Sequence, residues 1–118
     1  MITTRSSLQS IEFNGLRIFD YTAGQDTNSS VALIEVPPGA RHEEAWSKRS
    51  DKYYLITHGQ VHFILDGEIT EMKSGDFCLV RCGQRFSYSN VRSEMAILVL
   101  IHTPSFRIED EVFVNNDT

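Results

Sequence analysis

The feature that most constrains the fold is the grouping of apolar residues into short runs separated by turn signals. Runs of about four to eight residues rich in Val, Ile, Leu, Phe and Tyr are typical of β-strands. They predict strands at Leu16–Tyr21, Val31–Val36, Lys52–Thr57, Val61–Leu65, Phe77–Val80 and Met95–His102. No window shows the apolar spacing of an amphipathic helix. An all-β sandwich or small barrel is therefore expected.

Turn signals lie between these runs. Asp66-Gly67 separates Val61–Leu65 from Glu68–Met72 and predicts a hairpin, because glycine tolerates the positive φ of a two-residue turn. Proline cannot donate to a sheet ladder, so Pro37-Pro38 should end a strand. The sequence also predicts a loop at 24–30, a turn at 73–76, and a final strand at 107–114 followed by a polar end at 115–118.

Composition limits the class of protein. The 118 residues suffice for one ordinary domain spanning 1–118, and 41% apolar with 23% charged residues is typical of a soluble globular chain. A formal charge of -5 argues against a nucleic-acid partner and an anionic membrane surface. The N-terminus lacks a signal-peptide core, and two cysteines make no disulfide framework. We therefore expect a cytoplasmic protein with reduced thiols.

The segment between Gly39 and Gly59 carries a family resemblance. From Gly39, five residues lead to Ala45, then comes Ser47, four residues lead to Lys52, and six lead to Gly59. This spacing resembles the first motif of the cupin family, in which the three inner positions are His, His and Glu. Cupins are small jelly-roll barrels, so the resemblance implies an all-β, single-domain jelly-roll β-barrel.

A second segment resembles the second cupin motif. It begins at Gly75, has Arg81 where the family has proline, keeps Gly83 and Asn90, and has Phe86 where the family has histidine. The resemblance covers about residues 31–103, which leaves terminal arms at 1–30 and 104–118. It concerns the fold and says little about function.

The positions at which cupins hold a metal are changed in this sequence to Ala45, Ser47, Lys52 and Phe86. A divalent ion needs several deprotonated N, O or S donors, so we expect no metal and no cofactor. A non-standard site at His42, Glu44 and His102 stays open. Alternation along a strand speaks against it, because inward Ala45 and Ser47 would place Glu43 inward. The same alternation would turn His42, Glu44 and Trp46 outward.

The expected barrel interior is an aromatic cup with a few polar groups. The candidate ligand-binding residues are Glu43, Ser47, Lys52, Tyr54, Phe63, Phe86, Tyr88 and Asn90. Apolar walls with a few converging polar groups are typical of a small-molecule site. Alternatively, the aromatic rings fill the barrel. Lys52 either is a buried amine with a lowered pKa or reaches the mouth and pairs with Glu43 or Asp51.

Three functions fit this interior. The first is a metal-independent cupin that binds a small anionic or enolisable organic molecule in the barrel mouth. The second is an isomerase, cyclase or lyase that uses Lys52 with Tyr54 or Tyr88 as acid/base groups. The third is a filled structural or regulatory module. We also expect a homodimer in which Leu16–Tyr21 and Arg107–Val114 cover sheet edges.

Overall fold

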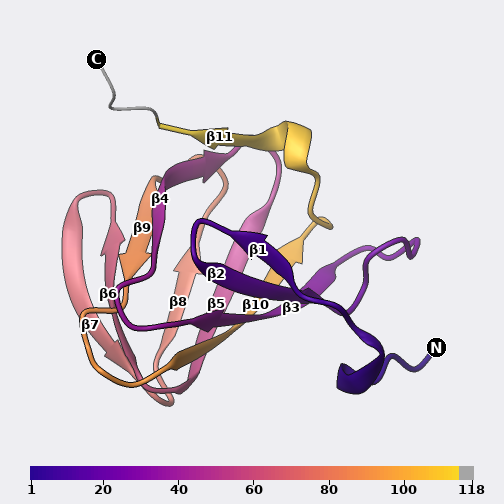
Figure 1. Cartoon of the computed structure of the whole chain (residues 1–118). Helices are drawn as coiled ribbons and strands as arrows, with labels where there is room; N and C mark the ends of the chain where they lie inside the picture. Colours follow the sequence, from indigo (N-terminus) through magenta and orange to yellow (C-terminus); the bar gives the residue numbers. More distant parts are fainter. Residues whose placement is uncertain (115–118) are drawn as a thin grey trace.

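Two antiparallel β-sheets pack face to face and form a flattened barrel (Figure 1). A computed structural model describes residues 1–114, and the predicted polar end at 115–118 lies outside the described residues. Residues 1–114 contain strands and two single-turn 3₁₀ helices, η1 (Arg5–Ser7) and η2 (Ile108–Asp110). No helix within that range is long and apolar enough to cross a membrane. The all-β prediction is confirmed.

The first sheet has six strands in the order β1–β2–β3–β10–β5–β8. Their bounds are β1 Ile11–Phe13, β2 Leu16–Asp20, β3 Ser30–Val36, β10 Ala96–Thr103, β5 Asp51–His58 and β8 Phe77–Val80. The second sheet has five strands in the order β11–β4–β9–β6–β7. Their bounds are β11 Glu111–Phe113, β4 Arg41–Ser47, β9 Phe86–Ser89, β6 Gln60–Leu65 and β7 Glu68–Lys73.

The six strands predicted from the apolar runs are all present to within two residues at each end. Asp66-Gly67 forms the predicted hairpin turn, with φ of 48° and 84°. Three strands were not predicted: β1, β4 and β9. The expected strand at 107–114 is correct only over Glu111–Phe113, because the chain first makes the 3₁₀ turn η2.

The core lies between the two sheets, on the faces that strand alternation turns inward. On β5, Lys52, Tyr54 and Ile56 are all buried, as predicted. The other large buried side chains include Leu16, Ile34, Val61, Phe63, Phe86, Tyr88 and Leu98. Full burial of one such apolar side chain contributes about 1.5–3 kcal/mol, so this layer is the main source of stability.

A β-bulge changes the orientation of residues on β4. Its pairing with β9 joins His42 to Tyr88 and Ala45 to Phe86, so β4 has one residue more than β9 over this stretch. An extra residue reverses the alternation of side chains along the strand. His42 therefore faces the interior together with Ala45, whereas Glu43 is exposed. The predicted inward Glu43 and outward His42 are both wrong for this reason.

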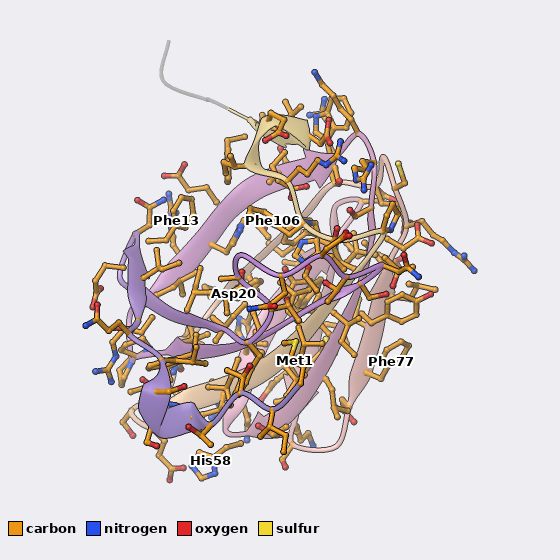
Figure 2. The ribbon with its side chains drawn as sticks, turned by 90° about the vertical axis from the view of Figure 1, so that its right-hand side faces the viewer. Met1, Phe13, Asp20, His58, Phe77 and Phe106 are labelled. Carbon is orange, nitrogen blue, oxygen red and sulfur yellow. The ribbon has the colours of Figure 1, made fainter. Side chains whose placement is uncertain are left out.

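Two rows on the outer face of the six-stranded sheet are also apolar. Leu33, Val99, Leu55 and Phe77 are neighbours across four strands. The next row consists of Val31, Ile101, Tyr53 and Leu79. An antiparallel sheet with one face in water normally places polar residues on that face. Phe77 nevertheless remains 56% exposed and lies at one side of the molecule in Figure 2.

Candidate functional site

A cavity of about 250 Å³ lies at one end of the barrel. Figure 2 shows Phe13 and Phe106, which line it, at the end opposite His58. Apolar side chains form most of its wall: Ile11, Phe13, Ile18, Ala32, Ile34, Leu100, Phe106, Ile108 and Phe113. The polar lining residues are Asp20, Ser30, His42, Lys52, Tyr54, His102 and Glu111. This combination is typical of a small-molecule site.

Aromatic rings close the barrel beneath this cavity. The ring of Tyr54 packs edge-on against Phe63 and Tyr88, at centroid distances of 5.3 and 5.6 Å. Phe63 in turn stacks on Phe86 and Tyr88. Of these four side chains, only Tyr54 reaches the cavity wall. The barrel is thus filled at its centre and hollow at one end.

Lys52 carries the cation of the cavity and is almost fully buried. Its Nζ forms an ion pair with the carboxylate of Glu111, and the two side chains are only 3% and 6% exposed. Burial lowers the pKa of Lys52, and the charge of Glu111 partly opposes this effect. The predicted partners were Glu43 and Asp51. That pairing is wrong, because the C-terminal strand β11 brings Glu111 over the barrel (Figure 1).

His102 extends this polar network. Its Nε2 lies 2.8 Å from Nζ of Lys52. An ammonium group can only donate, so Nε2 accepts and the remaining proton of the ring is on Nδ1. Burial, together with the charge of Lys52, lowers the pKa of His102 to about 3. His102 is therefore neutral near pH 7.

His42 lies on another part of the wall and is a second neutral imidazole. Its Nδ1 lies 2.6 Å from the carbonyl oxygen of Glu43, which can only accept, so Nδ1 carries the proton. The basic lone pair is then on Nε2. Burial lowers the pKa of His42 to about 4. Its ring packs on Phe86 and Tyr88 at 5.0 and 5.3 Å, so the aromatic cluster fixes its orientation.

Two tyrosine hydroxyls complete the polar groups near His42. Burial raises the pKa of both Tyr54 and Tyr88, so both stay protonated near pH 7. The hydroxyl of Tyr88 is buried without a hydrogen-bond partner among the described residues. The hydroxyl of Tyr54 is its nearest polar neighbour and acts on its pKa, so the two hydroxyls form one polar pair inside the aromatic cluster.

The remaining predicted site residues lie away from the cavity. Ser47 is buried, and its hydroxyl accepts from the backbone N–H of Ser50 at 2.9 Å. The side-chain amide of Asn90 donates to the carbonyl oxygens of Val36 and Glu94. Both residues therefore hold loops in place. Lys52 and Tyr54 are the members of the predicted set that line the cavity.

The residues present do not fit the metal that cupins commonly hold. Ala45 and Phe86 offer no donor atom, Lys52 is engaged with Glu111, and Ser47 binds a loop. Across residues 1–114, no three His, Cys, Asp or Glu side chains converge where they could hold a metal ion. His42, Glu44 and His102 thus form no such group.

Comparison with known proteins now identifies the family. The cupin domain family matches residues 32–102, and the chain belongs to that family. The jelly-roll prediction is thereby confirmed. No sequence match to a curated protein was found.

Several solved structures share this fold. A variant of Streptomyces PAC13 with uridine superposes with a TM-score of 0.83 at 24% identity, over 97% of this chain and 90% of that chain. A further structure of the same protein, described as a unique nucleoside dehydratase, gives a TM-score of 0.84. KdgF from Halomonas sp. gives 0.78 at 13% identity, over 92% of this chain and 96% of that chain. At these identities the likeness shows the fold alone.

Proposed function

We propose that this protein is a metal-independent lyase that removes water from a nucleoside-like molecule bound in the cavity. The observation that carries the proposal is His42, a neutral imidazole with its basic Nε2 free, held in the wall of an aromatic cavity. Its neutral ring can accept a proton near pH 7, although the lowered pKa makes it a weaker base than an exposed histidine.

The similarity to PAC13 supports the substrate class. PAC13 is described as a nucleoside dehydratase, and its variants solved with uridine replace one histidine or one tyrosine. One histidine and two tyrosines, His42, Tyr54 and Tyr88, also meet in this barrel. The aromatic and aliphatic wall suits the flat face of a base, and the polar groups suit ribose hydroxyls.

The proposed reaction is an elimination. Nε2 of His42 takes a proton from a carbon next to a carbonyl group of the substrate, and the C–H electron pair becomes part of a new C=C bond. The C–O bond to the neighbouring hydroxyl breaks, and the ammonium of Lys52 gives that hydroxyl a proton, so water leaves. His42 then returns its proton to Lys52 through solvent. Atoms and charges balance without an oxidant or reductant.

The polar groups have separate roles in this scheme. Lys52 is a better acid than an ordinary lysine, because burial lowers its pKa. Tyr54 stays protonated and can donate a hydrogen bond to the carbonyl oxygen, where negative charge develops. His102 accepts from Lys52 and orients its ammonium group.

The direct test is turnover of nucleosides whose ribose carries a carbonyl group, followed by mass spectrometry for the loss of one water. His42→Gln should reduce the rate by about 10²–10⁴-fold. His58→Gln is the matched control, because His58 is exposed at the opposite end of the barrel (Figure 2). Equal rates for the two variants would exclude His42 as the base.

A binding protein without turnover is the second candidate. The mostly apolar, partly enclosed wall favours it, because such a wall can retain a ligand without any chemistry. A wild type that binds uridine but converts no carbonyl-bearing nucleoside would support this alternative.

We also propose that two copies associate through the outer face of the six-stranded sheet. The rows Leu33–Val99–Leu55–Phe77 and Val31–Ile101–Tyr53–Leu79 contain no charged side chain. On the β2 side of these rows, Arg5 covers Phe19, the neighbour of Leu33, so the proposed contact is limited to the part of the face between β3 and β8. Two copies of a chain with a charge of -5 repel, so an uncharged contact face suits self-association. Apolar residues that recur on one face suit a two-fold contact, in which each copy offers the same patch.

A further inference from the structure

We propose that Glu111 makes the cavity select uncharged ligands and reject anions. The proposal rests on the cavity being the ligand site of the proposed function, but it does not depend on any reaction. It concerns the charge of the ligand and assigns a specificity-determining role to a residue on the C-terminal strand.

The first observation is the scarcity of free positive charge. Lys52 is the single Lys or Arg residue among those that line the cavity in the described part of the chain. Its ammonium already contacts the carboxylate of Glu111 and Nε2 of His102. The cation that would attract a carboxylate or phosphate ligand is therefore already paired.

The second observation is the sign of the remaining charges. Asp20 and Glu111 both line the cavity, against the one cation of Lys52. The carboxylate of Asp20 accepts hydrogen bonds from the backbone N–H and the hydroxyl of Thr22, at 3.0 and 3.1 Å, and meets no Lys or Arg among its described contacts. An anion that enters this space loses its hydration and gains no unpaired cation, so its transfer is unfavourable.

The third observation is how Glu111 reaches Lys52. Glu111 begins β11 and pairs with Ser47 of β4, at the edge of the five-stranded sheet. Two residues earlier, Glu109 in η2 is exposed. The chain thus provides a matched control, because Glu109 has the same side chain on the same segment but lies outside the cavity.

Removal of the Glu111 carboxylate should abolish or reverse the preference for uncharged ligands over anions. In Glu111→Gln, a bound anion would replace the carboxylate as the partner of Lys52 and would favour its protonated form. Anion binding should then take up protons, so the affinity for an anion should fall as pH rises through the lowered pKa of Lys52.

Benzamide and benzoate are suitable probes, because they share a ring that fits an aromatic wall and differ in charge. Calorimetry should show that the wild type and Glu109→Gln bind benzamide at least about tenfold more tightly than benzoate. In Glu111→Gln the affinity for benzoate should rise at least about tenfold. Lys52→Met combined with Glu111→Gln should lose this gain. Glu111→Ala provides a second variant without the carboxylate, in case the first does not fold.

The proposal is overturned if the wild type binds benzoate as tightly as benzamide, or if both folded Glu111 variants fail to gain benzoate affinity. These outcomes are separate from the turnover test. If the protein shows no lyase activity, the preference for benzamide over benzoate still tests the role of Glu111. If the protein turns over a nucleoside but shows no such preference, the role proposed for Glu111 is wrong.

Discussion

Lys52 and Glu111 form an ion pair inside the barrel although they belong to different sheets. Lys52 lies on β5 of the six-stranded sheet, and Glu111 lies on β11 at the edge of the five-stranded sheet. The contact joins residues 59 positions apart and fastens the C-terminal strand over the cavity. It therefore links the stability of the barrel end to the charge of the proposed site.

The pair should show strong coupling in a double-mutant cycle. Lys52→Met or Glu111→Gln alone leaves one charge buried without its partner, so each should lower the free energy of unfolding by about 3–5 kcal/mol. The double variant should be close to the wild type. Denaturant unfolding measures all three, with Glu109→Gln as the control. Additive effects of the two single variants would contradict a buried, mutually compensating pair.

The two cavity histidines should make the protein less stable in mild acid. His42 and His102 have folded-state pKa values of about 4 and about 3, below the ordinary 6.5. Between the folded-state pKa of each histidine and 6.5, the unfolded chain therefore binds more protons than the folded chain. The free energy of unfolding consequently decreases as pH falls below about 6.5. Each histidine contributes up to about 1.4 kcal/mol per pH unit in that window.

The histidine contribution can be isolated by substitution. His42→Gln should flatten the dependence of unfolding free energy on pH between about 6.5 and 4 relative to the wild type. A slope equal to that of the wild type would mean that His42 is not buried as a neutral ring.

Purified, untagged protein should carry no stoichiometric metal. The reason is the donor set, since the family's ligand positions hold Ala45, Ser47, Lys52 and Phe86. Elemental analysis is the check, with the melting temperature measured before and after chelation. About one equivalent of iron, manganese, nickel or zinc that survives mild chelation would refute this prediction.

The proposed dimer should depend on the outer face of the six-stranded sheet. Leu55→Glu places a charge opposite Phe77 in that face and should produce monomers in sedimentation or light scattering. Ile69→Glu is the control, because Ile69 is 68% exposed on β7 of the other sheet. A wild type that is already monomeric, or a Leu55→Glu variant with an unchanged dimer, would dispose of this interface.

Much of the fold could be predicted from the sequence because side chains alternate regularly along the strands that carry apolar runs. In the run that contains Lys52, Tyr54 and Ile56, these three side chains point inward, as the alternation predicted. Strand β1 was missed, although Asn14-Gly15 is a strong hairpin signal and both residues have positive φ, 50° and 86°. That signal could have predicted the β1–β2 hairpin, which brings Phe13 to the cavity wall.

Other parts of the site could not be predicted. The bulge that turns His42 inward lies in a charged stretch, Arg41 to Glu44. Because this stretch contains no apolar residues, its sequence does not indicate which side chains face the interior. The approach of Glu111 to Lys52 depends on where β11 docks, and no local pattern fixes a contact over 59 residues. The cytoplasmic location stays a prediction.

The four histidines allow the most direct test of the central claim, that the cavity at His42 binds a nucleoside. His42 and His102 line the cavity, whereas His58 and His62 lie outside it. Histidine-selective ¹⁵N NMR during titration with uridine reports on all four rings at once. We predict saturable shifts at His42 and His102, with His58 and His62 unchanged. No shift at millimolar uridine, or equal shifts at all four rings, would contradict the claim.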